Sequence, residues 1–127
     1  MGRSKTKRLL LTDRSLDDIA AIEKYSIERW GKKTASKYVG QIENALSLIH
    51  SNPDLLRQEE GFPPFLRFYN VNKHVLVFDI QMREIILLTL FHGSMDIPSR
   101  LAELAPALAT EVELLHLKLQ REHGSSR

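Results

Sequence analysis

Four residues with chemistry-bearing side chains stand at or near the ends of strand-like segments in the second half of the sequence: Arg67, His74, Arg83 and His92. Antiparallel pairing can bring such residues together on one face of a sheet. A histidine, with a reference pKa of about 6.5, can transfer a proton near neutral pH, and an arginine can hold two phosphate oxygens. Arg67, Arg83 and His92 are therefore candidate catalytic residues for cleaving an RNA phosphodiester.

Structural roles for the same residues stay open. Arginines on strands commonly lie in solvent and pair with acids such as Glu84, and a lone histidine is more often structural or exposed than a ligand. Asp96, in LTLFHGSMDIPSRL (residues 88–101), is typical of a turn residue whose carboxylate accepts backbone N–H bonds. Spacing alone favours these roles over catalysis.

The composition excludes several kinds of site. The 127-residue sequence contains no cysteine, which rules out disulfide bonds and thiolate metal sites. It also lacks a phosphate-binding glycine loop, a pair of histidines at metal-binding spacing on one helix and a G-x-S-x-G nucleophile elbow. We therefore expect neither a metal nor a cofactor.

Charge and length favour one compact domain in the cytoplasm. The 18 basic and 16 acidic residues give a net charge of +2, which is too balanced to argue for nucleic acid as a partner. The N-terminal apolar run, Leu9 to Leu11, is too short for a signal peptide or a membrane span. We expect a cytoplasmic protein with no membrane partner.

The first half of the sequence predicts a strand and a helical hairpin. Residues 7–12 (KRLLLT) have the pattern of a short strand, and apolar residues then recur at helical spacing as far as the Asn52-Pro53 stop. Ser15 is expected to cap the first helix. Gly31 is expected to end it, because glycine readily adopts the left-handed conformation of a helix stop. A corner this short makes the two helices antiparallel neighbours.

The second half predicts a sheet and a helical tail. After an irregular connection at residues 53–65, the hydrophobic period becomes two in LRFYNV and HVLVFDI, and IILLTLFH is apolar on both faces. These segments predict a three-stranded antiparallel meander packed on the helices, which the N-terminal strand is free to join. Leucines at helical spacing from residue 99 onward predict one or two amphipathic helices, with Pro106 tolerable only near a helix start. The expected class is α+β.

Four segments carry a family resemblance: SLDDIAAIEKYSIERWG (15–31), ALSLIHSNPDLLRQ (45–58), LRFYNVNKHVLVFDI (66–80) and IILLTLFHGSMDIPSRL (85–101). They are similar to a first helix with D-x-x-x-I and a terminal R-W-G, a second helix ending in Asn-Pro, an arginine-bearing hairpin, and a closing strand with a His-x-x-x-Asp-x-Pro signature. In this order they resemble the ParE toxins of the RelE/ParE superfamily, which are toxins of plasmid-stabilising toxin–antitoxin pairs.

The resemblance implies a RelE/ParE-like fold and the toxin of a type II toxin–antitoxin system, neutralised by a cognate antitoxin of the ribbon-helix-helix type. In the family, the antitoxin folds along a groove between the helical hairpin and the sheet, so Trp30 and Tyr38 are expected to bind this partner. ParE members inhibit DNA gyrase by binding it, whereas RelE members cut mRNA on the ribosome. Arg67 matches the hairpin arginine, and His92 and Asp96 match the ParE signature. These three residues are the expected target-binding residues.

Departures from the family pattern define the alternatives. RelE-type enzymes carry lysines before the hairpin and a C-terminal tyrosine, whereas this chain has no tyrosine after Tyr69. A RelE-like, ribosome-dependent mRNA endonuclease is therefore the alternative to a non-enzymatic gyrase inhibitor. Many ParE members have a second basic residue where this chain has Ser94 and Met95. A homologue with weakened toxicity is the further alternative.

The tail is the other departure, because family members commonly end near the position of Leu101. The expected organisation is a ParE-like domain at residues 1–101 and a helical extension at residues 102–127, packed on that domain or on a partner.

Overall fold

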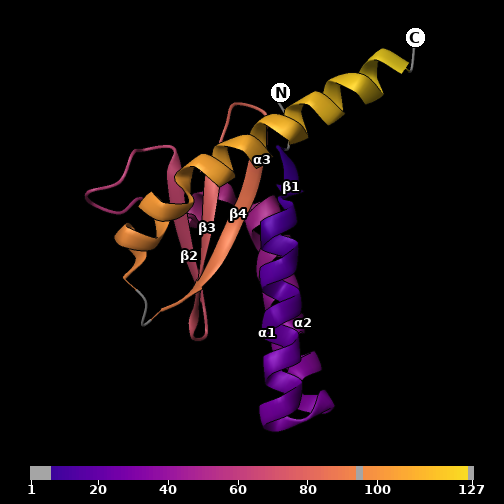
Figure 1. Ribbon diagram of the computed structural model, residues 1–127, viewed down its shortest axis with the longest axis vertical. Helices are drawn as coiled ribbons and strands as arrows, with labels where there is room; N and C mark the ends of the chain where they lie inside the picture. Colours follow the sequence, from indigo (N-terminus) through magenta and orange to yellow (C-terminus); the bar gives the residue numbers. More distant parts are fainter. Residues whose placement is uncertain (1–6, 94–95, 126–127) are drawn as a thin grey trace. The chain divides into compact units, whose positions relative to one another are not determined.

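The computed structural model describes residues 7–93 and 96–125 and is α+β, as predicted (Figure 1). The chain forms two compact units, Met1–Gly93 and Ser94–Arg127. The elements of the first unit are β1 (Arg8–Leu11), α1 (Asp13–Trp30), α2 (Lys32–Ser51), the 3-10 turn η1 (Pro53–Leu55), β2 (Leu66–Val71), β3 (His74–Ile80) and β4 (Glu84–His92). The second unit contains α3 (Ile97–Ser125).

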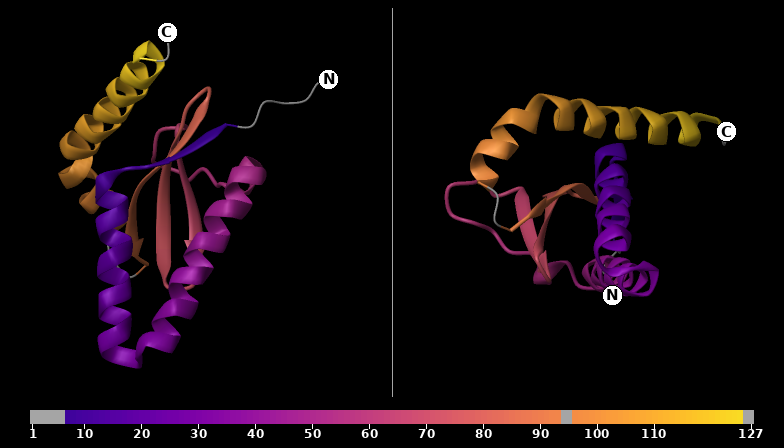
Figure 2. Two further views of the ribbon diagram at one scale, coloured as in Figure 1. Left: turned by 90° about the vertical axis from the view of Figure 1, so that its right-hand side faces the viewer. Right: turned by 60° about the horizontal axis from the view of Figure 1, so that its bottom comes forward.

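The strands form one sheet in the order β1-β4-β3-β2. The predicted meander of β2, β3 and β4 is antiparallel, and β1 joins it beside β4 in parallel. The helical hairpin of α1 and α2 lies along one face of this sheet (Figure 2). The prediction of a hairpin packed on a meander is confirmed.

The start of α1 differs from the prediction. Thr12, not Ser15, is the N-cap, because its hydroxyl oxygen accepts a hydrogen bond from the Ser15 backbone N–H at 3.0 Å. The same hydroxyl donates to the carbonyl of Leu88 at 2.8 Å. One buried side chain therefore caps the helix and attaches it to β4.

The two helix ends that the sequence predicted are confirmed. Gly31 separates α1 from α2 with a φ of 94°, which is a left-handed conformation that glycine adopts without strain. Its N–H donates to the Ile27 carbonyl at 2.9 Å, and its carbonyl accepts from Ala35 N–H at 3.1 Å. At the far end of α2, the Asn52 N–H donates to the Leu48 carbonyl at 2.8 Å, just before Pro53.

The hydrophobic core lies between α2 and the sheet. Its buried members are Ile42, Ala45, Leu46, Ile49, Leu56, Val71, Leu76, Phe78, Ile85, Leu87 and Leu90. Ile42 and Ile49, one face of α2, are fully buried, as are Leu76 and Phe78 of β3. Complete burial of each such side chain contributes about 1.5–3 kcal/mol, which explains why the three-four apolar spacing of α2 is so regular.

A β-bulge interrupts the pairing of β3 with β4. Val77 pairs with Thr89 while Phe78 pairs with Leu87, so Leu88 is the additional residue of β4. The carboxylate of Asp18 in α1 accepts hydrogen bonds here from the Thr89 hydroxyl and from the Leu90 backbone N–H. The bulge thus presents two donors that the helix satisfies with one charged side chain.

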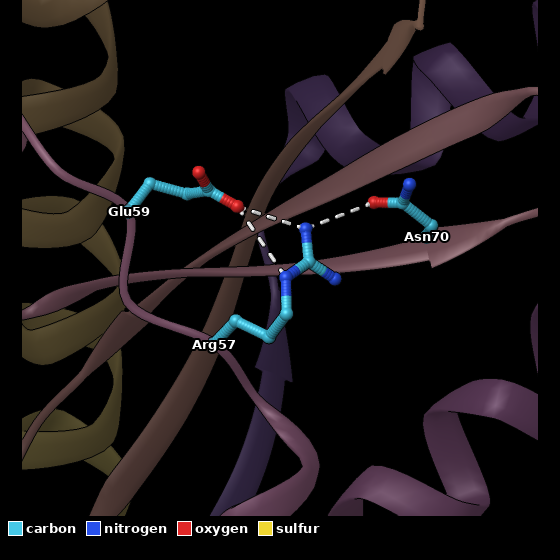
Figure 3. A network of polar contacts seen from close by, with 3 residues as sticks. All are labelled: Arg57, Glu59 and Asn70. Atoms are coloured by element: carbon cyan, nitrogen blue, oxygen red, sulfur yellow. Dashed lines mark hydrogen bonds and ion pairs between the residues drawn. The ribbon is translucent and has the colours of Figure 1, made fainter.

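The outer edge of β2 is protected by the connection that precedes it. Arg57 and Phe68 exchange two backbone hydrogen bonds, at 3.0 and 2.9 Å. The Arg57 guanidinium also forms an ion pair with Glu59 at 3.0 Å and donates to the side-chain oxygen of Asn70 at 3.3 Å (Figure 3). These contacts occupy part of a strand edge that could otherwise pair with another chain.

The second unit is one helix with its own cap. The Asp96 carboxylate accepts from the Ser99 backbone N–H at 3.4 Å and from the Ser99 hydroxyl at 3.0 Å, which confirms its predicted turn role. Pro106 lies inside α3 rather than near its start, so the prediction for this residue was wrong. Over the parts of the chain that are described, no helix has the length and apolar character needed to cross a membrane.

Candidate functional site

The predicted catalytic residues lie at two different ends of the sheet. Arg67 of β2 is level with Phe78 of β3, and Phe78 is level with Leu87 of β4. His92 lies five residues beyond Leu87 along β4, which corresponds to about 15 Å. Arg83 directly precedes β4 and so lies farther still from His92. The expectation that sheet pairing gathers Arg67, Arg83 and His92 was wrong.

Strand direction explains this separation. In a meander, the first and third strands run parallel to each other, so the start of β2 and the end of β4 point to opposite ends of the sheet. Arg67 also has a structural contact, since its Nε donates to the Pro64 carbonyl at 2.8 Å. The arginines therefore do not face the phosphate that a proton donor at His92 would serve.

The structure instead pairs His92 with His74. His74 begins β3, His92 ends β4, and the two are directly opposite each other. The Gly93 N–H donates to the Lys73 carbonyl at 2.8 Å, so the adjacent His74–His92 pair is of the non-hydrogen-bonded type, in which side chains lie closest. The two imidazole centroids are 5.4 Å apart, with the ring planes at 79°.

A tyrosine from α2 completes this cluster. The Tyr38 hydroxyl is hydrogen-bonded to Nδ1 of His74, and it donates to the Val71 carbonyl at 3.3 Å. The direction of the bond between Tyr38 and Nδ1 of His74 depends on which ring nitrogen of His74 carries the proton. We call Tyr38, His74 and His92 the histidine cluster.

Burial shifts the pKa of two members of the histidine cluster, His74 and Tyr38. It lowers the pKa of His74 below its usual value of 6.5, and the neighbouring charge of His92 lowers it further. Burial also raises the pKa of Tyr38, an effect that a backbone hydrogen bond with Lys73 partly offsets. At neutral pH, His74 is a neutral imidazole and Tyr38 a neutral phenol.

The expected partner-binding residues, Trp30 and Tyr38, lie in different environments. Trp30 is 55% exposed at the end of α1, where its ring meets Tyr25 edge to face at 6.0 Å and the Arg29 guanidinium lies 6.0 Å from its centroid. Tyr38 is half-buried, with its hydroxyl engaged in the histidine cluster. Trp30 and Tyr25 together present an exposed aromatic surface at the tip of the helical hairpin.

Of the other predicted positions, Asp96 has a structural contact, and Ser94 and Met95 have no described structure. Asp96 caps α3 and belongs to the second unit, whereas His92 belongs to the first. Ser94 and Met95, where the family pattern changes, lie outside the described residues. Target binding by Arg67, His92 and Asp96 stays a prediction.

The sequence contained only part of the information needed to find these contacts. That His74 and His92 share one end of the sheet follows from the meander, because the second strand starts where the third strand ends. Nothing in the sequence linked Tyr38 to His74, or Asp18 to the bulge, since each contact depends on how the hairpin is placed against the sheet. Among the residues whose side chains the structure describes, no group of three or more His, Asp or Glu residues could hold a metal ion.

Comparisons with known proteins agree with the fold and the segment order. The model of the family described as "ParE toxin of type II toxin-antitoxin system, parDE" matches residues 9–97. The solved "Chromosomal ParDE TA system from P. aeruginosa" is similar with a TM-score of 0.62 and 19% identity, covering 70% of this chain and 98% of that chain. No curated protein sequence matches. The family match spans most of the chain, and the protein therefore belongs to the ParE toxin family of type II toxin–antitoxin systems.

Proposed function

We propose that this ParE toxin inhibits DNA gyrase by binding it and is neutralised by a cognate ribbon-helix-helix antitoxin. The observation that carries the choice of binding over RNA cleavage is the separation of Arg67 and Arg83 from His92 along the sheet. Cleavage needs cations and a proton donor around one phosphate. We place the protein in the cytoplasm, where gyrase acts.

His92, Asp96 and Arg67 are each proposed to contribute to target binding. His92 is exposed at the end of β4, whereas Arg67 donates to the Pro64 carbonyl at the other end of the sheet. We therefore expect His92 to contribute more to target binding than Arg67 does.

The antitoxin is proposed to cover the exposed aromatic surface of Trp30 and Tyr25. Exposed Trp, Tyr and Arg side chains are the types that most often dominate binding energy at protein interfaces, and Arg29 lies beside the Trp30 ring. Tyr38 is expected to act indirectly, by holding His74, because its hydroxyl is already engaged.

Induction of the gene in cells separates the two toxin mechanisms. A gyrase inhibitor should arrest growth and reduce the supercoiling of a reporter plasmid while mRNA ends, mapped by primer extension, stay unchanged. His92→Ala should relieve the arrest, and Arg57→Ala, which removes an exposed ion pair on the β2 edge, is the matched control. Arrest with normal supercoiling would contradict gyrase as the target.

The RelE-like endonuclease remains the second candidate because the histidine cluster holds two imidazoles close together, a pairing that can supply an acid and a base. For an endonuclease, induction should create new mRNA ends that disappear in His92→Ala. Unchanged transcripts would exclude it. Normal growth and normal supercoiling at a high level of the folded chain would indicate the homologue with weakened toxicity.

A further inference from the structure

Within the histidine cluster, His74 and His92 face one another across the neighbouring strands β3 and β4, as two ligands of one ion would. His74 and His92 are directly opposite in a pair of the non-hydrogen-bonded type, so their Cα atoms are about 4.5 Å apart and both side chains leave the same face of the sheet. Antiparallel β-structure holds both backbones, which reduces the conformational entropy lost when the two rings bind a common ligand.

The ring spacing fits a shared metal ion. Zinc binds histidine nitrogen at about 2.0–2.1 Å with tetrahedral geometry. Two imidazoles bound in this way have centroids about 5.2 Å apart, when the ring radius is added to the bond length. The observed centroid separation of 5.4 Å is close to this value before any side chain moves.

Tyr38 is a hydrogen-bond partner for one ring nitrogen of His74, as is usual for a histidine that binds a metal through its other ring nitrogen. Metal-bound histidines commonly donate the second N–H to a carboxylate, carbonyl or water, which fixes the ring orientation and the tautomer. Here Nδ1 of His74 is hydrogen-bonded to the Tyr38 hydroxyl, which is itself bonded to the Val71 carbonyl. When the proton of His74 is on Nδ1, this nitrogen donates to the Tyr38 oxygen and the lone pair on Nε2 can bind a cation.

We propose that His74 and His92 form a two-histidine binding site for a borderline transition-metal cation, Zn²⁺ or Ni²⁺, oriented by Tyr38. Imidazole nitrogen suits these cations rather than Mg²⁺ or Ca²⁺, which prefer oxygen ligands. With two protein ligands, water completes the coordination, and the affinity is lower than that of a structural site with four protein ligands.

Binding at this position has a physical consequence for the fold. The cation links the start of β3 to the end of β4, and any ligand that binds only the folded chain raises its stability by mass action. The site is therefore detectable both as heat of binding and as an increase in Tm. Neither readout depends on whether gyrase is the target.

Isothermal titration of the untagged, chelator-treated full chain with NiCl₂ and with ZnCl₂ at pH 7.5 tests the proposal. One cation should bind per chain and raise the Tm, and MgCl₂ should do neither. His92→Ala is the main variant because His92 lies exposed at the strand end, and it should abolish saturable binding. Tyr38→Phe keeps both ligands but removes the orienting hydroxyl, so it should weaken binding by about 10-fold.

Two controls complete the test. The double variant His116→Ala/His123→Ala removes both histidines of the tail and should bind as the original chain does. Circular dichroism should show that His92→Ala retains its secondary structure. The absence of saturable binding by the original chain, unchanged binding by His92→Ala, or loss of binding only in the tail variant would each overturn the proposal.

Discussion

At the scale of single residues, the side chain of Asp18 connects the helical hairpin to the sheet. Its carboxylate accepts hydrogen bonds from the hydroxyl of Thr89 and the backbone N–H of Leu90, both at the bulge of β4. A bulge leaves backbone groups outside the regular ladder, and a partly buried donor without an acceptor is costly. Asp18 therefore stabilises the bulge as well as the contact between α1 and β4.

Replacement of Asp18 by alanine should lower the free energy of unfolding by about 1.5–3 kcal/mol, because two donors lose a charged acceptor. Urea denaturation followed by circular dichroism measures this change. Asp17→Ala is the matched control, since Asp17 is an exposed neighbour on the same helix and should change stability far less. Equal effects of the two substitutions would contradict the role assigned to Asp18.

The histidine cluster predicts a dependence of stability on pH. The folded chain holds the pKa of His74 below the unfolded value of about 6.5. At pH values between these two pKa values, the unfolded chain therefore binds more protons than the folded chain does. The stabilisation is complete above pH 6.5 and is lost as the pH falls through the folded pKa.

Urea denaturation at pH 7.5, 6.5 and 5.5 should show this loss in the original chain and a smaller loss in His74→Gln. The comparison between the two chains removes the contribution of the other titrating groups. The same pH dependence in both chains would show that His74 is not responsible.

At the scale of helices and strands, the hydrophobic period predicted every element of the first unit except the short turn η1, and the strand limits agree within one residue. The errors concern local hydrogen bonds. Ser15 has the right residue type for an N-cap, but Thr12 takes the position because its hydroxyl can also reach the Leu88 carbonyl. Pro106 is tolerated inside α3 although it removes one helical N–H bond, a cost that a helix of this length can offset.

Thr12→Ala should destabilise the chain by about 1–2 kcal/mol, since it removes the cap of α1. Ser15→Ala should cost less, because the Ser15 hydroxyl donates to a Thr12 carbonyl that also accepts the Leu16 N–H. Thermal unfolding of the two variants side by side gives the order. A larger effect of Ser15→Ala would support the cap that the sequence predicted and contradict the one observed.

At the scale of the whole molecule, the fold was more predictable than the site. The order of segments identified the family and the meander. Residue types at strand ends predicted a candidate site, but residue types alone do not show which strand ends lie together in the sheet. Strand direction separates Arg67 from His92 and unites His92 with His74, whereas the contribution of Tyr38 depends on helix–sheet packing that no sequence pattern contains.

The tail gives a prediction at the same scale. The family match ends at residue 97, and α3 continues to Ser125. We propose that the leucines after residue 101 are covered by the toxin domain or by a partner, so deletion of residues 105–127 should reduce solubility or change the affinity for the antitoxin. Sedimentation and a binding titration measure these effects. A truncated chain that matches the full chain in both would remove any role for the tail.

The most direct test of the central claim is the supercoiling activity of purified gyrase titrated with the purified full chain. Inhibition should increase with the concentration of the chain and reach saturation, as expected for binding. His92→Ala should require a higher concentration, and Arg57→Ala should match the original chain. Full supercoiling at saturating amounts of the folded chain would contradict gyrase inhibition.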